Sequence, residues 1–246
     1  MMAPLVSTRM LPANAFRDDV VLIMSELPSM DRAFTTVFHK SGARAVHSTD
    51  IFGARDAFND AERKDGPVTI LINGPRVADE PQAAEFLELE GWRDMHRREF
   101  DAPLAACLEF ARRRMDDKRG GSILNVLQSG ASVGMPGYAA RASAKAGLEG
   151  LTRTLAVEWA PYDIRVNALL LGIMAEEKTQ NDASASIPAQ RLCESHEAAW
   201  AASFLCSNYA AYITGASFAI DGGNGLRRGL SGPEFRPVRE WGFGTP

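Results

Sequence analysis

The stretch VVLIMSELPSMDRAFTTVFHKSG, residues 20–42, contains the pattern that decides the fold. It begins with five consecutive apolar residues, which is typical of a strand buried on both faces of a parallel sheet. From about Ser29 the apolar residues recur at helical spacing, and Gly42 stands where a helix commonly ends. A buried strand followed by such a helix is the repeating unit of α/β proteins.

The same alternation continues along the chain. It predicts further strands at 43–47, 68–72, 122–127, 165–171 and 216–220, and helices at 50–63, 90–114, 139–159 and 196–207. Asp50 is the expected N-cap of the helix that follows it. The order of elements predicts an α/β fold, a doubly wound, Rossmann-like parallel sheet with helices on both faces. We expect a single domain over 1–223, of which 1–18 form a loose N-terminal arm, and an extended C-terminal arm over 224–246.

Composition excludes several functions. Hydrophobic residues make up 46% of the 246 residues, and the formal net charge of −4 gives no reason to expect nucleic acid or an anionic membrane as partner. The three cysteines are scattered, as in a reducing cytoplasm, and neither they nor the four histidines have the spacing of metal ligands. No apolar run reaches membrane-spanning length, and we expect no secretory signal. The expected location is therefore cytoplasmic, and no metal is expected.

A series of motifs occupies the second half of the chain: GSILNV (121–126), ASAKAGL (142–148), LTRTLAVE (151–158), PYDIRVNA (161–168), YITG (212–215) and DGG (221–223). In this order and spacing they resemble the short-chain dehydrogenase/reductase family. The resemblance implies that family's Rossmann-like sheet. It also implies a shortened first half, because the family normally has two helices and an extra strand where one helix is expected between Gly42 and Val68.

The resemblance locates the four positions from which the family builds catalysis. Lys145 matches the family's lysine, but Arg141 stands in place of the tyrosine and Gln128 in place of the serine. The asparagine position falls on Glu99. Arginine is effectively never deprotonated in a protein, so Arg141 cannot act as the acid/base. We therefore expect no intact catalytic set, with Glu99, Gln128 and Arg141 as degenerate positions and Lys145 retained.

The cofactor-binding turn is altered as well. The family's three glycines, which let backbone N–H groups approach a pyrophosphate, align with Ser25, Ser29 and Asp31. Glu26 and Asp31 add negative charge at the helix start, which suits the helix dipole but repels a phosphate. The sequence therefore predicts that this chain binds no cofactor. Asp50 could imitate the family's acidic ribose ligand, although the N-cap interpretation is favoured.

Two neighbouring residues could compensate for the lost groups. Ser129 follows Gln128 but should face the other way, and Tyr138 lies about two helical turns from Lys145, too far for the family's Tyr–Lys coupling. Gln128, Arg141 and Lys145 could form an anion-binding cluster. The alternative, which we favour, is a filled pocket in which Arg141 pairs with Glu99 or Asp101.

These features favour a non-catalytic subunit that assembles with an active paralogue. The chain resembles the pseudo-oxidoreductase subunit of the heteromeric 2-[hydroxy(phenyl)methyl]succinyl-CoA dehydrogenase of anaerobic toluene degradation, a benzylsuccinate pathway. That resemblance implies a hetero-oligomer, expected to be a tetramer, whose active short-chain dehydrogenase subunit carries NAD. One alternative is a non-redox enzyme on the same fold, a lyase, isomerase or dehalogenase-like protein. Another is a homomeric ligand-binding or regulatory protein.

Overall fold

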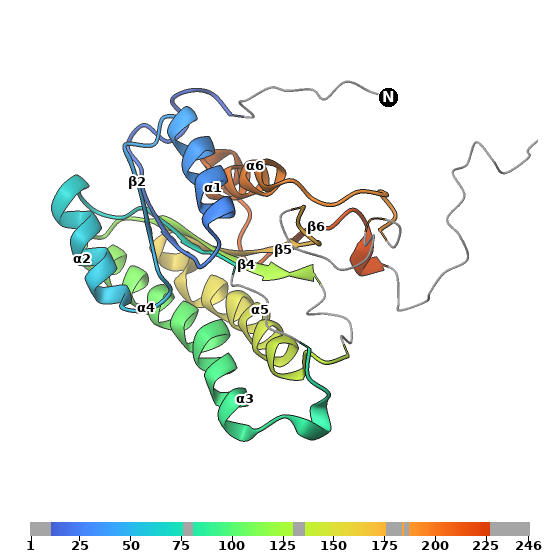
Figure 1. Cartoon of the computed structure of the whole chain (residues 1–246). Coiled ribbons are helices and arrows are strands. Elements are labelled where there is room, and N and C mark those ends of the chain that lie inside the picture. Colours follow the sequence, from blue (N-terminus) through green and yellow to red (C-terminus); the bar gives the residue numbers. More distant parts are fainter. Residues whose placement is uncertain (1–10, 76–80, 130–135, 176–183, 185–186, 227–246) are drawn as a thin grey trace, which may run out of the picture.

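A parallel sheet forms the centre of the fold (Figure 1). The computed structural model describes residues 11–75, 81–129, 136–175, 184 and 187–226. In this part of the chain six strands pair in parallel in the order β2-β1-β3-β4-β5-β6. They are β1 (Val20–Met24), β2 (Ala45–Thr49), β3 (Ile70–Asn73), β4 (Gly121–Gln128), β5 (Ile164–Leu171) and β6 (Ser217–Ile220). The order reverses between β1 and β3, so the predicted doubly wound sheet is confirmed.

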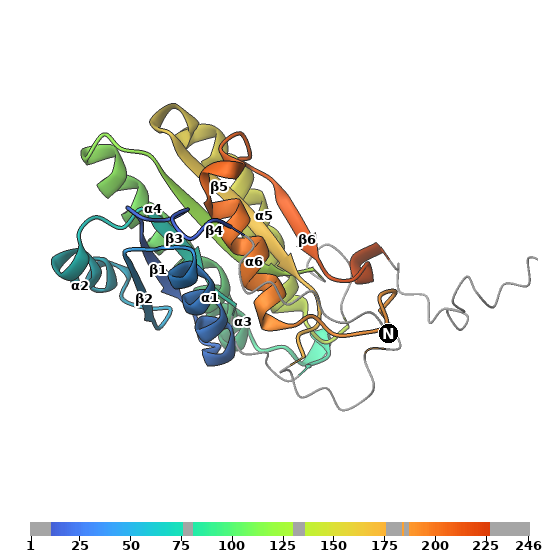
Figure 2. The same ribbon diagram turned by 90° about the horizontal axis from the view of Figure 1, so that it is seen from above.

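Helices cover both faces of the sheet (Figures 1 and 2). One layer contains α1 (Pro28–Lys40) and α6 (Ser195–Cys206), and the other contains α2 (Ala54–Asp65), α4 (Ala102–Asp116) and α5 (Ala139–Trp159). In β1, Val21 and Ile23 belong to the core under α1 and α6, whereas Val20, Leu22 and Met24 belong to the core under the other layer. This division explains the continuous apolar run, because both faces of the strand are buried.

The helical segment expected over 90–114 contains an irregularity that the sequence did not predict. Here α3 (Leu89–His96) passes through the π-helical turn Arg97–Asp101 directly into α4. Such single π-helical turns are rare and occur frequently at functional sites. Short 3-10 turns complete the described helices at Ala84–Phe86, Ala160–Tyr162, Asn208–Ala210 and Asn224–Leu226.

Two local predictions need correction. Gly53, not Asp50, is the N-cap of α2, and the Asp50 carboxylate instead accepts a hydrogen bond from the backbone N–H of Phe52 at 2.9 Å. The expected loose arm is packed from residue 11 onward, because Phe16 is 1% exposed and its ring lies 4.8 Å from that of Phe38. Residues 1–10 of that arm, and 227–246 of the C-terminal arm, lie outside the described residues.

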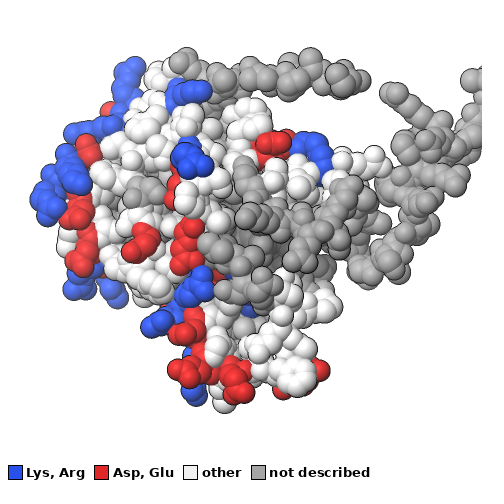
Figure 3. Space-filling model, in the orientation of Figure 1, with Lys and Arg blue, Asp and Glu red and all other residues white. Residues whose placement is uncertain are grey.

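The first half of the fold is shortened as expected. A single helix, α2, connects the edge strand β2 to β3. An ion pair between Glu62 of α2 and Arg113 of α4 joins these two neighbouring helices. On the face shown in Figure 3, charged side chains of both signs gather over α2 and around α3. None of the described helices combines the length and hydrophobicity that a membrane span requires.

Candidate functional site

The candidate side chains meet at the carboxyl ends of the central strands. Doubly wound sheets bind their ligands outside these ends, where the strand order reverses. The turn after β1 and the Gly74–Pro75 segment after β3 lie on one side of this region, and the last residues of β4 and β5, Gln128 and Leu171, lie on the other. Helix α5 contributes Arg141 and Lys145 to the same place.

Three charged side chains form a buried triad there: Glu99, Arg141 and Lys145. One carboxylate oxygen of Glu99 lies 3.0 Å from a guanidinium nitrogen of Arg141, and the other lies 2.6 Å from the Lys145 ammonium. The side chains are only 1%, 5% and 6% exposed, respectively. Buried charges of this kind are tolerated only when they are paired, and here one carboxylate serves two cations.

Local structure explains how the triad forms. Arg141 and Lys145 are four residues apart on α5, so they project from the same helical face. Glu99 lies in the π-helical turn Arg97–Asp101 and is its buried residue, whereas Asp101 is exposed. Of the two partners proposed for Arg141, Glu99 and Asp101, the structure therefore shows an ion pair with Glu99. Gln128 is half-buried and lines the same cavity as the triad.

The remaining cavity is very small. Its volume is about 10 Å³, and beside the triad it is bordered by Leu27, Pro75, Leu127, Gln128, Leu171, Gly172 and Met174. A volume of about 10–15 Å³ is what one water molecule needs. As far as the described residues define it, this pocket has no space for a substrate or for a nicotinamide ring. Leu27 and Pro75, which the sequence analysis did not single out, close the pocket from the side of the β1 turn.

The turn after β1 satisfies its own backbone. The Ser25 hydroxyl accepts the N–H of Leu27 at 3.1 Å, and the N–H of Glu26 donates to the Pro75 carbonyl at 3.3 Å. Ser25 is 5% exposed and packs so closely on Gly74 that a Cβ atom there would lie 2.5 Å from the Ser25 Cβ. The donors that a phosphate would need in this turn are thus engaged within the protein.

The start of α1 is equally unsuited to a phosphate. Pro28 occupies the first turn and has no N–H to donate, Ser29 follows it, and Asp31 places a carboxylate in that turn. Glu26 is held by an ion pair of 2.9 Å with Arg98 from the π-helical turn. The described residues do not fit a dinucleotide: Ser25, Ser29 and Asp31 stand in place of glycines, Pro28 offers no N–H, and Asp31 adds a carboxylate to the first turn of α1.

Comparison with known proteins places this site in a family context. Residues 24–224 match the family model described as enoyl-(acyl carrier protein) reductase. The chain belongs to the short-chain dehydrogenase/reductase family. It is 35% identical over 216 residues to galactitol 2-dehydrogenase (L-tagatose-forming) of Cereibacter sphaeroides, covering 83% of this chain and 84% of that protein.

Solved structures of short-chain dehydrogenases agree with the fold. A short-chain dehydrogenase from Bacillus anthracis is 27% identical with a TM-score of 0.79, covering 87% of this chain and 99% of that one. The 3-ketoacyl-(acyl-carrier-protein) reductase of Brucella melitensis, crystallised with NADH, is 26% identical with a TM-score of 0.78, covering 84% and 98%. The family's oxidoreductase fold is therefore present in this chain, together with a closed pocket.

The other sequence-derived candidates are not members of the triad. Ser129 is 4% exposed. Tyr138 is the N-cap of α5 and borders a surface cavity of about 260 Å³ that Arg141 of the triad also lines. Among the described residues, no group of three or more His, Cys, Asp or Glu side chains is arranged to hold a metal ion.

A buried polar network supports the strand ends. The Asn73 amide donates to the Asn125 side-chain oxygen at 2.8 Å, and the Asn125 amide donates to the Thr152 hydroxyl at 2.9 Å. The network links β3, β4 and α5 and includes the Cys107 thiol, whose pKa is raised to about 12 by burial. It fixes α5, and hence Arg141 and Lys145, against the sheet.

Proposed function

We propose that this short-chain dehydrogenase is a non-catalytic subunit of a hetero-oligomeric dehydrogenase, in which an active paralogous subunit carries NAD and acts on an alcohol or hydroxyacyl-CoA. The observation that carries the proposal is the pairing of Glu99 with both Arg141 and Lys145 inside a pocket of about 10 Å³. In such a pocket both cations are already paired with one carboxylate, and the described residues leave little room for a substrate.

The chemistry of the triad supports an inactive site. Hydride transfer to or from an alcohol requires a group that exchanges a proton near the working pH. Arg141 cannot do so, because a guanidinium stays protonated. Lys145 is held by the Glu99 carboxylate at 2.6 Å, so its ammonium is already engaged within the triad. Neither residue can therefore take the role of a proton donor and acceptor.

The surface supports assembly with another subunit. Large apolar side chains are exposed around the edge strand β6 and the end of α5: Val157, Tyr162, Tyr209, Tyr212 and Phe218 are 78%, 53%, 64%, 104% and 43% exposed. The Ser217 hydroxyl of β6 bonds to Glu149 of α5 at 2.8 Å, so the two elements are neighbours. Apolar side chains that gather on a surface commonly mark protein–protein contacts.

The non-redox alternative is less well supported. A lyase or isomerase that used Glu99, Arg141 and Lys145 would need to admit a substrate between them, yet these side chains contact one another directly. The cavity beside the triad gives room for about one water molecule.

Native mass spectrometry of the tagged protein purified from its own host tests the proposal. We expect a mixed assembly with an intact short-chain dehydrogenase, and cofactor only on that partner. Calorimetric titration of the isolated chain with NAD(H) and NADP(H) should give no binding. A homo-oligomer without a partner, or micromolar binding of either cofactor to this chain alone, would contradict the proposal.

A further inference from the structure

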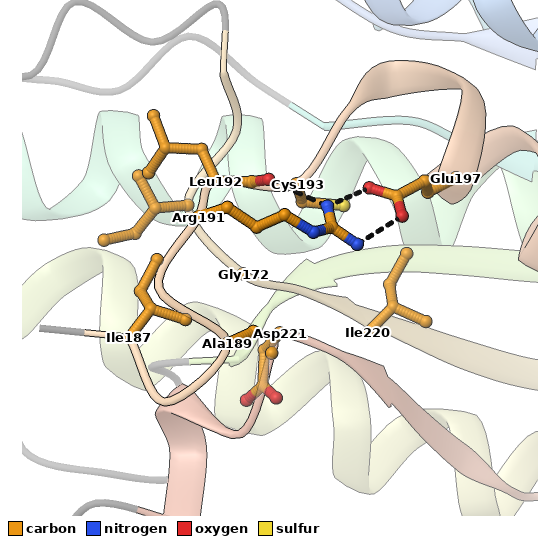
Figure 4. Close-up of a pocket in the computed structure, with 11 residues that line it drawn as sticks. Gly172, Ile187, Ala189, Arg191, Leu192, Cys193, Glu197, Ile220 and Asp221 are labelled. Atoms are coloured by element: carbon orange, nitrogen blue, oxygen red, sulfur yellow. Dashed lines mark hydrogen bonds and ion pairs between the residues drawn. The ribbon is translucent and has the colours of Figure 1, made fainter. Parts of the chain in front are cut away.

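A second cavity, of about 180 Å³, lies at the carboxyl ends of β5 and β6 (Figure 4). It is formed by the residues that follow these two strands, by the loop 187–193 and by Glu197 at the start of α6. Gly172 borders both this cavity and the closed pocket, so the two are neighbours. The triad itself does not contribute to the second cavity.

Backbone hydrogen bonds hold the walls of this cavity in place. The N–H of Ala189 donates to the Gly222 carbonyl at 3.1 Å, and that of Cys193 donates to the Ile173 carbonyl at 3.0 Å. The loop packs so closely on the strand ends that a Cβ atom at Gly222 would lie 2.8 Å from an Ile187 methyl carbon. Ligand sites are usually preformed in this way, because a wall that is already ordered costs no further entropy on binding.

The lining is mainly apolar, with one partly exposed ion pair. Its apolar side chains come from Ile173, Ile187, Ala189, Leu192 and Ile220. Arg191 crosses the cavity wall and makes two hydrogen bonds of 2.7 Å to Glu197 (Figure 4). Glu197 is fixed further by its capping-box bond from the N–H of Glu194 at 3.0 Å, and the Arg191 hydrogen bond lowers the pKa of Glu197.

Charge in the lining disfavours anions. Besides Glu197, the carboxylate of Asp221 borders the cavity, where it accepts the N–H groups of Gly223 at 2.9 Å and Gly225 at 2.7 Å. The guanidinium of Arg191 is already engaged by Glu197, and no other Lys or Arg is among the described residues that line the cavity. A phosphate or carboxylate ligand would therefore find no free cation, whereas a neutral ligand meets a largely apolar surface.

We propose that this cavity is a binding site for a small, neutral, mainly apolar molecule about the size of an aromatic ring. Its volume of about 180 Å³ is close to the roughly 150 Å³ of an apolar cavity that accommodates benzene. Drug-sized ligands need about 300–1,000 Å³ and do not fit. The site is independent of the closed pocket, and it holds whether or not the chain assembles with a partner.

Benzamide and benzoate provide a matched pair of probes, because they share one shape and differ in charge. We expect ligand-observed NMR to show saturable binding of benzamide to the full chain, and benzoate to bind at least about tenfold more weakly. Ile220→Trp fills the cavity from β6 and should abolish benzamide binding. Phe218→Trp is the control, since residue 218 lies on the same strand but does not line the cavity.

Leu192→Trp fills the cavity from the loop and replaces Ile220→Trp if that variant does not fold. Loss of benzamide binding in the filled variant, with binding retained in Phe218→Trp, supports the site. The proposal is overturned if benzamide does not bind the wild type, if benzoate binds equally well, or if the filled variant binds as tightly as the wild type.

Discussion

Replacing Glu99 with glutamine tests whether the triad exists in solution. The substitution keeps the shape of the side chain and removes its charge, so Arg141 and Lys145 remain as buried cations that face a neutral amide. Breaking a buried ion pair by removing one partner costs about 3–5 kcal/mol. For a chain of this size, roughly 2–4 °C of melting temperature are lost per kcal/mol, so we expect a decrease of about 6–20 °C.

The matched control is Glu26→Gln. Its ion pair with Arg98 has a similar distance of 2.9 Å, but the side chains are 23% and 26% exposed. A pair so accessible to water contributes at most about 1 kcal/mol. Urea unfolding followed by circular dichroism measures the free energy of unfolding of both variants, with equal slopes confirming a comparable transition. If Glu99→Gln lowers the free energy of unfolding no more than Glu26→Gln does, the buried triad does not exist in solution.

Four further predictions concern the turn after β1, Arg165 and the three cysteines. The double variant Gln128→Ser/Arg141→Tyr should give no nicotinamide turnover in a spectrophotometric assay, because the turn after β1 remains filled by Ser25, Leu27 and Pro28; measurable turnover would show that this turn does not block the cofactor. Arg165→Met should reduce the free energy of unfolding in urea by about 2–3 kcal/mol, with partial recovery in Arg165→Lys. The reason is that Arg165 donates to four backbone carbonyls at the end of α6 and after it, those of Leu205, Cys206, Ser207 and Ile213. An unchanged free energy of unfolding would contradict this capping role. In the native protein at pH 8, iodoacetamide should modify the half-buried Cys193 before Cys107 and Cys206, whose pKa values burial raises to about 12. The unfolded thiols ionise near their ordinary pKa of 9.0, so the folded state binds more protons than the unfolded state between about pH 9 and 12. The free energy of unfolding should therefore fall as pH rises through that window. Urea titrations at about pH 8 to 11 that give a constant free energy would contradict the raised pKa values.

The sequence predicted the elements of the fold because their signals are local. The apolar run 20–24 gives β1 with the expected bounds, and the long helix expected over 139–159 begins and ends at those residues. Strand bounds elsewhere differ by about two residues, as at β2 and β3. The Asp50 cap was wrong because an Asp followed by a helix pattern does not specify where the first turn closes, and Gly53 with its positive φ of 73° closes it three residues later.

The site could be predicted only in part. The spacing of Arg141 and Lys145 places two cations on one helical face, and the family resemblance directed attention to Glu99. Whether Arg141 and Lys145 bind an external anion or pair with Glu99 depends on how closely α5 packs against the π-helical turn. A sequence pattern does not specify how close that packing is. Leu27 and Pro75 were missed for a similar reason, although Pro28 in a turn without glycines was a usable signal of an occupied turn.

Two features close the pocket, the ion-paired triad and the filled turn after β1, and each depends on the other. The attraction within the triad is strong only where water is largely excluded, because a hydrated carboxylate gains little from an ion pair. Leu27, Pro75 and Met174 exclude that water by bordering the same small cavity as Glu99 and Lys145. In turn, the filled turn after β1 can pack inward because Glu99 pairs with both cations and offsets part of their charge. Restoring one half of an active site therefore leaves the other half closed. This coupling favours a subunit that contributes its fold and surface over a dehydrogenase that has exchanged one catalytic residue for another.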